Sequence, residues 1–165
     1  MLSRLLGKKK HAQKQEHDLY KASDAGDLVS VRAALADGQS PNSRGLCRGG
    51  TSKDRTCLIA AVREGHEEVV TELLQQEDCD LSLEDRNKYT ALHHACDRGR
   101  VGTVRQLAYH PRQGSLNSKN INGNTAIMVA VWHGEAECVL ALGRVARVEL
   151  DNRDYMGRSL EERAR

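Results

Sequence analysis

The sequence predicts an all-α solenoid, a fold of stacked helix–turn–helix pairs, and three observations carry this prediction. Four glycines recur at spacings of 39, 34 and 35 residues, one in each copy of an internal repeat. Small and aliphatic residues recur at fixed distances on both sides of each glycine. Only two prolines occur in the 165 residues, so most of the chain is free to be helical.

Five positions agree across the four copies. Each glycine follows an apolar residue by seven positions and an alanine by four. A valine stands five positions after it, and alanine or leucine stands eight positions after it. In the third copy these positions are Leu92, Ala95, Gly99, Val104 and Leu107. One copy cannot bury such apolar faces alone, whereas stacked copies can.

Each copy is predicted to contain two short helices. Thr56, Thr90 and Thr125 open the three later copies, and threonine is a good N-cap because its hydroxyl accepts from a backbone N–H. The glycine ends the first helix, since the residue after a helix often adopts the left-handed conformation. A second helix with one apolar face follows. Segments rich in turn-forming residues, at 85–88 and 120–123, then lie between copies.

These residues resemble the ankyrin repeat, which has a period of about 33 residues and the signature Thr-Pro-Leu-His-x-Ala. The signature has counterparts at residues 56–61, 90–95 and 125–130. The resemblance covers roughly residues 17–158, and it implies an ankyrin solenoid. No copy has the proline, and only the third has the histidine, His93, where the others have Ile59 and Met128. We expect looser turns in those two copies and no change of fold.

The basic residues near the N-terminus predict a flexible basic tail at residues 1–16, and the resemblance implies one ankyrin repeat domain at 17–165. An extra segment at 43–51, rich in glycine and arginine, interrupts the period and predicts a long mobile loop. The final fragment is either a complete cap or the start of a further repeat, and the sequence leaves both open. The repeats are expected at about 17–42, 52–85, 86–120 and 121–154, with a fragment of a fifth at 155–165.

Charge and hydropathy exclude some classes of function. The 25 basic and 23 acidic residues nearly balance, so we expect no nucleic acid partner. No run of apolar residues is long enough to span a membrane. The tail is the exception in charge, and Leu2, Leu5 and Leu6 lie beside its basic residues. Residues 1–14 therefore have three alternative interpretations. They make weak contact with an anionic membrane surface, act as an import signal, or form a simple solvated tail.

No catalytic, cofactor or metal site is expected. The sequence has no Ser-His-Asp set and no phosphate-binding glycine loop. His93, next to His94, holds the signature position, and His66 and His133 flank helix-ending glycines, which disfavours a metal site. Four of the five cysteines fall at small or apolar repeat positions, so Cys47, in the predicted loop, is the candidate reactive thiol.

Protein recognition is the expected function. In ankyrin proteins the concave face is lined by hairpin tips and by the last exposed turn of each first helix, so the resemblance places the partner-binding residues there. Trp132 lies between Ala130 and Gly134, and we interpret it as an exposed anchor, with a partly buried core aromatic as the alternative. The expected residues are Arg55, Arg63, Glu64, Arg86, Asn87, Tyr89, Asp97, Arg98, Ile121, Asn122, Asn124, Trp132 and His133.

We therefore expect a monomeric scaffold or adaptor with a protein partner and no chemistry of its own. The odd number of cysteines and the missing signal peptide favour a reducing compartment, the cytoplasm or alternatively the nucleus. Two other functions remain open. One is a regulatory module of a larger multidomain protein, such as a kinase or a ubiquitin-ligase adaptor, and the other is a membrane-peripheral protein held by its tail.

Overall fold

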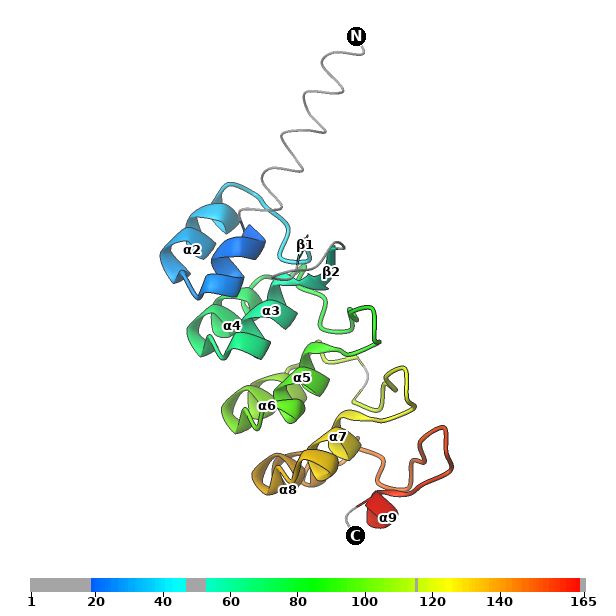
Figure 1. The fold of residues 1–165 in the computed structure, drawn as a ribbon. Coiled ribbons are helices and arrows are strands. Elements are labelled where there is room, and N and C mark those ends of the chain that lie inside the picture. Colours follow the sequence, from blue (N-terminus) through cyan, green and yellow to red (C-terminus); the bar gives the residue numbers. More distant parts are fainter. Residues whose placement is uncertain (1–18, 47–52, 115, 164–165) are drawn as a thin grey trace. The chain divides into compact units, whose positions relative to one another are not determined.

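The computed structural model describes residues 19–46, 53–114 and 116–163 (Figure 1). The predicted tail at 1–16, Cys47 and the rest of the predicted loop, residues 48–51, lie outside these residues. The chain forms two compact units, Met1–Cys79 and Asp80–Arg165, and each is described by itself.

The first unit contains two helical pairs. Helical residues 19–25 precede α2 (Leu28–Ala36), and α3 (Cys57–Glu64) packs against α4 (Glu67–Leu74). Helix α2 also packs on α4, which joins the two copies (Figure 1). The positions predicted to be apolar lie inside, as Leu19, Val31, Leu58 and Val70 show with exposed fractions of 2% or less.

An antiparallel hairpin connects the two helical pairs of the first unit. Strand β1 (Arg44–Leu46) pairs with β2 (Lys53–Thr56), with Arg44 opposite Thr56. The loop predicted over 43–51 therefore contains a strand at residues 44–46. The physical reason is a close approach, because Gly45 packs against the ring of the buried Tyr20 and leaves no room for a side chain.

The second unit contains two complete helical pairs and one short helix. Helix α5 (Ala91–Asp97) packs on α6 (Val101–Ala108), and α7 (Ala126–His133) packs on α8 (Ala136–Gly143). Between copies, α5 contacts α7 and α6 contacts α8. Helix α9 (Leu160–Arg163) contacts α7 and opens the fifth fragment (Figure 1).

Threonine begins the first helix of the three later copies, as predicted. The Thr56 hydroxyl accepts from the Ile59 N–H at 3.2 Å, so this cap forms without the signature histidine. Thr90 forms a reciprocal capping box with His93. Thr125 stands at the N-cap, but its hydroxyl has no hydrogen-bond partner within the described part of the chain. Without the histidine, the threonine cap thus forms in the second copy and not in the fourth.

Glycine ends the first helix in every copy, as the spacing predicts. Each of these glycines has a φ between 63° and 87°, a left-handed conformation that costs glycine little and other residues more. The predicted fold class, an all-α repeat of helical pairs, is confirmed. None of the described helices is long and apolar enough to cross a membrane. The glycines are Gly26, Gly65, Gly99 and Gly134.

Replacing Leu92 by alanine should lower the free energy of unfolding by about 2–5 kcal/mol, because Leu92 is 2% exposed and its removal leaves a cavity. Leu150→Ala is the matched control, since Leu150 is 51% exposed and should change stability by less than about 0.5 kcal/mol. Urea denaturation measures both. A loss below about 1 kcal/mol for Leu92→Ala would contradict the assignment of this register to the core.

Replacing Gly45 by alanine should destabilise the protein by about 1–3 kcal/mol, because the new methyl group would overlap the Tyr20 ring. Gly114→Ala controls for the loss of glycine itself, since no atom lies within 4 Å of the added carbon there. Thermal unfolding followed by circular dichroism compares the two variants. Equal melting temperatures would mean that the hairpin does not pack on Tyr20.

Candidate functional site

Three turns of the second unit, residues 85–89, 120–124 and 154–158, share one construction, and we call them the tips. In each tip the first side chain accepts hydrogen bonds from the backbone N–H groups two and four residues later, at 2.8–3.0 Å. Asp85 accepts from Asn87 and Tyr89, Asn120 from Asn122 and Asn124, and Asp154 from Met156 and Arg158.

The two charged acceptors, Asp85 and Asp154, each contact a basic side chain. Asn120 is neutral and needs no such partner. Asp85 contacts Nε2 of the buried His94 at 2.9 Å, and Asp154 contacts Nε of Arg158 at 2.9 Å. Burial alone would raise the pKa of Asp85, but its hydrogen bonds to His94 and Tyr89 outweigh burial and hold this pKa below its ordinary value. These carboxylates therefore shape the tips from beneath and present little surface to a partner.

Backbone hydrogen bonds link successive tips to one another. The Ile121 N–H donates to the Asn87 carbonyl at 3.0 Å, and the Tyr155 N–H donates to the Asn122 carbonyl at 3.3 Å. The three tips thus hold a fixed spacing. Their side chains at the outermost positions project from a backbone that is bonded to its neighbours.

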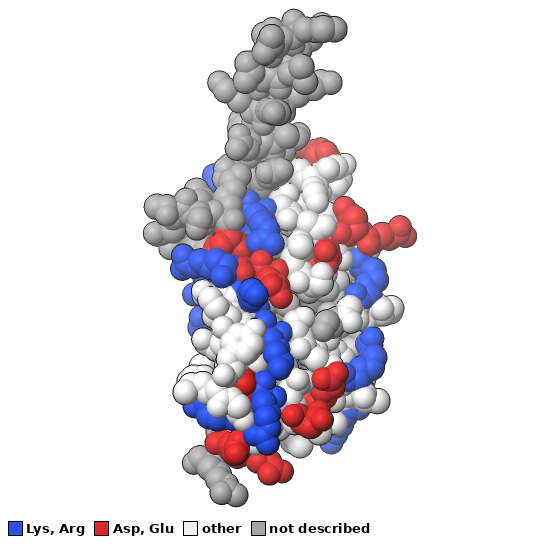
Figure 2. Space-filling model, turned by 90° about the vertical axis from the view of Figure 1, so that its right-hand side faces the viewer, with Lys and Arg blue, Asp and Glu red and all other residues white. Residues whose placement is uncertain are grey.

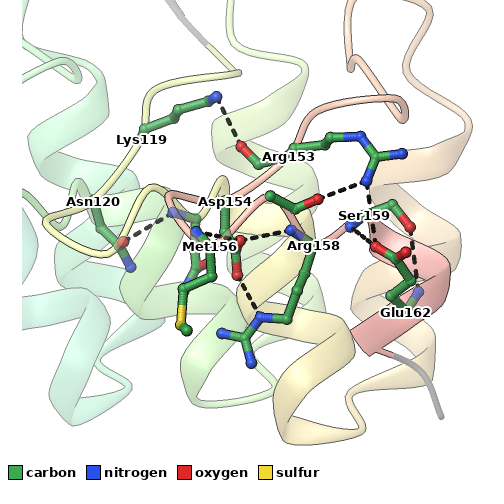
Figure 3. A network of polar contacts seen from close by, with 10 residues as sticks. Lys119, Asn120, Arg153, Asp154, Met156, Arg158, Ser159 and Glu162 are labelled. Atoms are coloured by element: carbon green, nitrogen blue, oxygen red, sulfur yellow. Dashed lines mark hydrogen bonds and ion pairs between the residues drawn. The ribbon is translucent and has the colours of Figure 1, made fainter.

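The last tip belongs to an ordered fifth fragment (Figure 3). The Lys119 ammonium donates to the Arg153 carbonyl at 3.0 Å, and the Arg153 guanidinium donates to the Gly157 carbonyl at 2.6 Å. Ser159 and Glu162 then cap α9 reciprocally, the Ser159 N–H donating to the Glu162 carboxylate at 2.6 Å. Residues 153–163 therefore repeat the opening of a complete copy.

The last turns of α5 and α7 bring three predicted site residues together. His133 Nε2 lies 3.1 Å from one Asp97 oxygen, and Arg98 Nε lies 3.3 Å from the other. Trp132, beside His133, is 57% exposed. The alternative interpretation of Trp132 as a core aromatic is therefore wrong, because helix α7 directs its neighbour Ala130 inward and leaves Trp132 in solvent.

The predicted site residues differ in exposure. Asn124 is 1% exposed, because its backbone N–H donates to Asn120 and its carbonyl contacts His93, so it is not available to a partner. Four are partly exposed, namely Arg55, Arg63, Tyr89 and Asp97. Eight are exposed: Glu64, Arg86, Asn87, Arg98, Ile121, Asn122, Trp132 and His133. Arg55, Arg63 and Glu64 belong to the first unit, and the others to the second.

Sequence reasoning missed two exposed apolar residues at the last tip. Tyr155 is 67% exposed and Met156 is 77% exposed. The available signal was register, since they follow Asp154 as Arg86 and Asn87 follow Asp85. On the face of the second unit that Figure 2 presents, Lys and Arg side chains lie beside Asp and Glu and beside uncharged surface. The tips therefore offer a partner both charge and apolar area.

The buried histidines and cysteines have structural surroundings. His93 Nδ1 accepts from the Thr90 N–H at 3.2 Å, and its Nε2 donates to the Asn124 carbonyl at 3.1 Å, an arrangement that requires the neutral ring. Burial raises the pKa of the Cys57 thiol to about 12 and also raises the pKa values of Cys96 and Cys138. These thiols fill the core, as their repeat positions predict.

Comparison with known proteins identifies the repeat. A family model for ankyrin repeats in three copies matches residues 19–120 and also 58–154. A probable E3 ubiquitin-protein ligase of Oryza sativa, XBOS31, is 33% identical over 138 residues, which cover 81% of this chain and 29% of that protein. A putative E3 ubiquitin-protein ligase of Arabidopsis thaliana, XBAT31, is 29% identical over 77% of this chain and 26% of its own length.

A third relative matches this chain over a shorter segment. The human BCL-6 corepressor is 46% identical over 52 residues, which cover 32% of this chain and 3% of that protein. The chain thus spans less than a third of the length of each of these relatives.

His93 should make the protein less stable in mild acid. Burial lowers the pKa of His93 from 6.5 to about 4, so the unfolded chain binds the proton more tightly than the folded one. Stability should therefore fall as the pH drops from 6.5 towards 4, by up to about 3 kcal/mol. His93→Met, which installs the residue that the fourth copy has, should remove this part of the slope. Urea denaturation at several pH values tests this, and equal slopes would contradict it.

Proposed function

Since the chain belongs to the ankyrin repeat family, whose repeats are protein–protein interaction modules, we propose that it binds a partner protein through its second unit. The binding surface consists of the tips and the last turns of α5 and α7. This function needs no catalytic group from the chain. The candidate residues are Arg86, Asn87, Asp97, Arg98, Ile121, Asn122, Trp132 and His133.

The exposure of Trp132 is the single observation that supports this proposal most strongly. Its side chain exposes apolar area in water at a place where the neighbouring His133 is held by Asp97. Tryptophan is enriched among the residues that dominate binding energy, and arginine, here Arg98, is enriched with it. An aromatic side chain on a short helix between packed neighbours also loses little conformational entropy when a partner covers it.

The tips favour a partner segment with acidic and apolar side chains. Asp85 and Asp154 are buried beneath the tips, whereas Arg86, Lys88 and Arg158 are exposed. The exposed side chains of the tips are therefore more basic than the sequence of these turns suggests. Such charges would contribute mainly to the association rate and to the choice of partner.

A role as the recognition part of a larger assembly is the second candidate. Two relatives are named as probable or putative E3 ubiquitin-protein ligases, and the match covers only 29% and 26% of them. In that case the chain would select the protein to be modified, and the ligase chemistry would reside elsewhere. The observation that favours this candidate is the coverage of the matches and not a feature of the site.

Replacing Trp132 by alanine should weaken partner binding by roughly 2 kcal/mol or more, because an anchor residue would be lost. The free energy of unfolding should change by less than about 1 kcal/mol, as expected at an exposed site. Tyr109→Ala is the matched control, since Tyr109 is 58% exposed at the end of α6 and outside the proposed surface. The wild type and the two variants are each used for affinity purification from the native cell. Calorimetric titration of the captured protein then measures the difference in binding free energy.

The two variants separate a specific site from general stickiness. Loss of the same captured protein with Trp132→Ala, but not with Tyr109→Ala, would support the proposal. Equal capture by all three proteins would contradict it. Iodide quenching gives an independent check, because Trp132 is the only tryptophan and its fluorescence should become protected when the partner binds.

A further inference from the structure

Helix α8 carries an apolar face that its counterpart in the preceding copy buries. Val131 and Val139 are partly exposed and Gly143 is exposed. The residues in the same register of the third copy are Cys96, Val104 and Ala108, each 1% exposed or less. In the third copy, α5 and α6 are covered by α7 and α8 of the fourth copy. The fourth copy therefore presents a surface of the kind that a further helix covers.

The exposed face of α8 forms one continuous stripe. Ala136, Val139, Leu140 and Gly143 stand at helical spacings of three and four, so they lie on the same side of the helix. A shallow hollow of about 370 Å³ lies along this stripe and is lined by Val131, Gly134, Ala136, Val139 and Leu140.

Leu140 departs from the rest of the repeat. The first copy has Arg32 and the third has Arg105 at the same register, and both are exposed as expected for a position facing solvent. Leu140 is 53% exposed, an apolar side chain where the other copies place a polar one. The stripe is thus wider and more apolar than stacking of one more repeat would require.

We propose that α8 packs against α8 of a second copy of this chain, antiparallel and about a two-fold axis. Two identical faces that meet in a closed pair are related by a two-fold axis. Antiparallel packing places the bulky Val139 and Leu140 at the centre, with the small Ala136 of each copy opposite Gly143 of the other. Small residues at the ends let the two backbones approach.

Charge at the edge of the stripe fits the antiparallel arrangement. Glu137 and Arg144 are both exposed, lie seven residues apart and therefore share one flank of the helix. In an antiparallel pair the same flanks face each other. Glu137 of each copy then lies beside Arg144 of the other copy, giving two symmetric attractions, whereas in a parallel pair this flank would face the opposite flank of the partner helix and these attractions would not form. The interface is one helix wide, so the dimer is weak.

Sedimentation velocity of the full chain, at concentrations from roughly 10 µM to 1 mM, tests this dimer. The wild type should pass from monomer to dimer within this range. Leu140→Arg should weaken dimerisation at least about tenfold while preserving the circular dichroism spectrum, because arginine is the residue that the first and third copies have there. Leu150→Arg, at an exposed leucine outside the stripe, should leave dimerisation unchanged.

A charge swap tests the orientation and does not depend on Leu140. Glu137→Arg and Arg144→Glu should each weaken the dimer roughly tenfold, and the double variant should recover wild-type association. Three outcomes would overturn the proposal: a monomeric wild type at every concentration, a dimer unaffected by Leu140→Arg, or a charge swap that does not recover. None of these outcomes bears on the partner binding proposed for Trp132, since none of the substituted residues belongs to the surface proposed for that partner.

Discussion

The side-chain acceptor at the base of each tip is the interaction on which the second unit depends. In each five-residue tip two backbone N–H groups do not pair with a carbonyl of the turn, and an unsatisfied buried N–H costs about 1–3 kcal/mol. Asp85, Asn120 and Asp154 each satisfy two of them. The fixed tips then bond to one another, which aligns the helices that begin just after them.

A charged acceptor needs a basic side chain beside it, whereas a neutral acceptor does not. Asp85 and Asp154 carry a buried negative charge, which is costly without a partner, and each is paired, with His94 and with Arg158. Asn120 makes the same two backbone hydrogen bonds without charge, and Val129 occupies the position that corresponds to His94. The residue types at these paired positions are therefore coupled by electrostatics.

Much of the fold could be predicted from the sequence because the same pattern of residues recurs in several copies. Glycine spacing located every first-helix end, and threonine located the start of the first helix in the three later copies. The hairpin at Gly45 could not be predicted, since it depends on Tyr20, a residue 25 positions earlier that no local pattern connects to it. In the candidate site, the register of the repeat predicted exposed positions for both Trp132 and Asn124. Trp132 is exposed, but Asn124 is buried. Burial of Asn124 follows from a tip geometry that only the hydrogen bonds reveal.

The tips separate the residues that determine structure from those that face outward. The six hydrogen bonds described above for the tips join backbone N–H groups to the acceptor side chains and use no side-chain atom of the two outermost residues. Those positions hold Arg86 and Asn87 in one copy and Tyr155 and Met156 in another, with the same geometry beneath. Mutation can therefore change the outward-facing side chains one tip at a time while the geometry beneath them is kept, which makes the tips suitable positions for a randomised library.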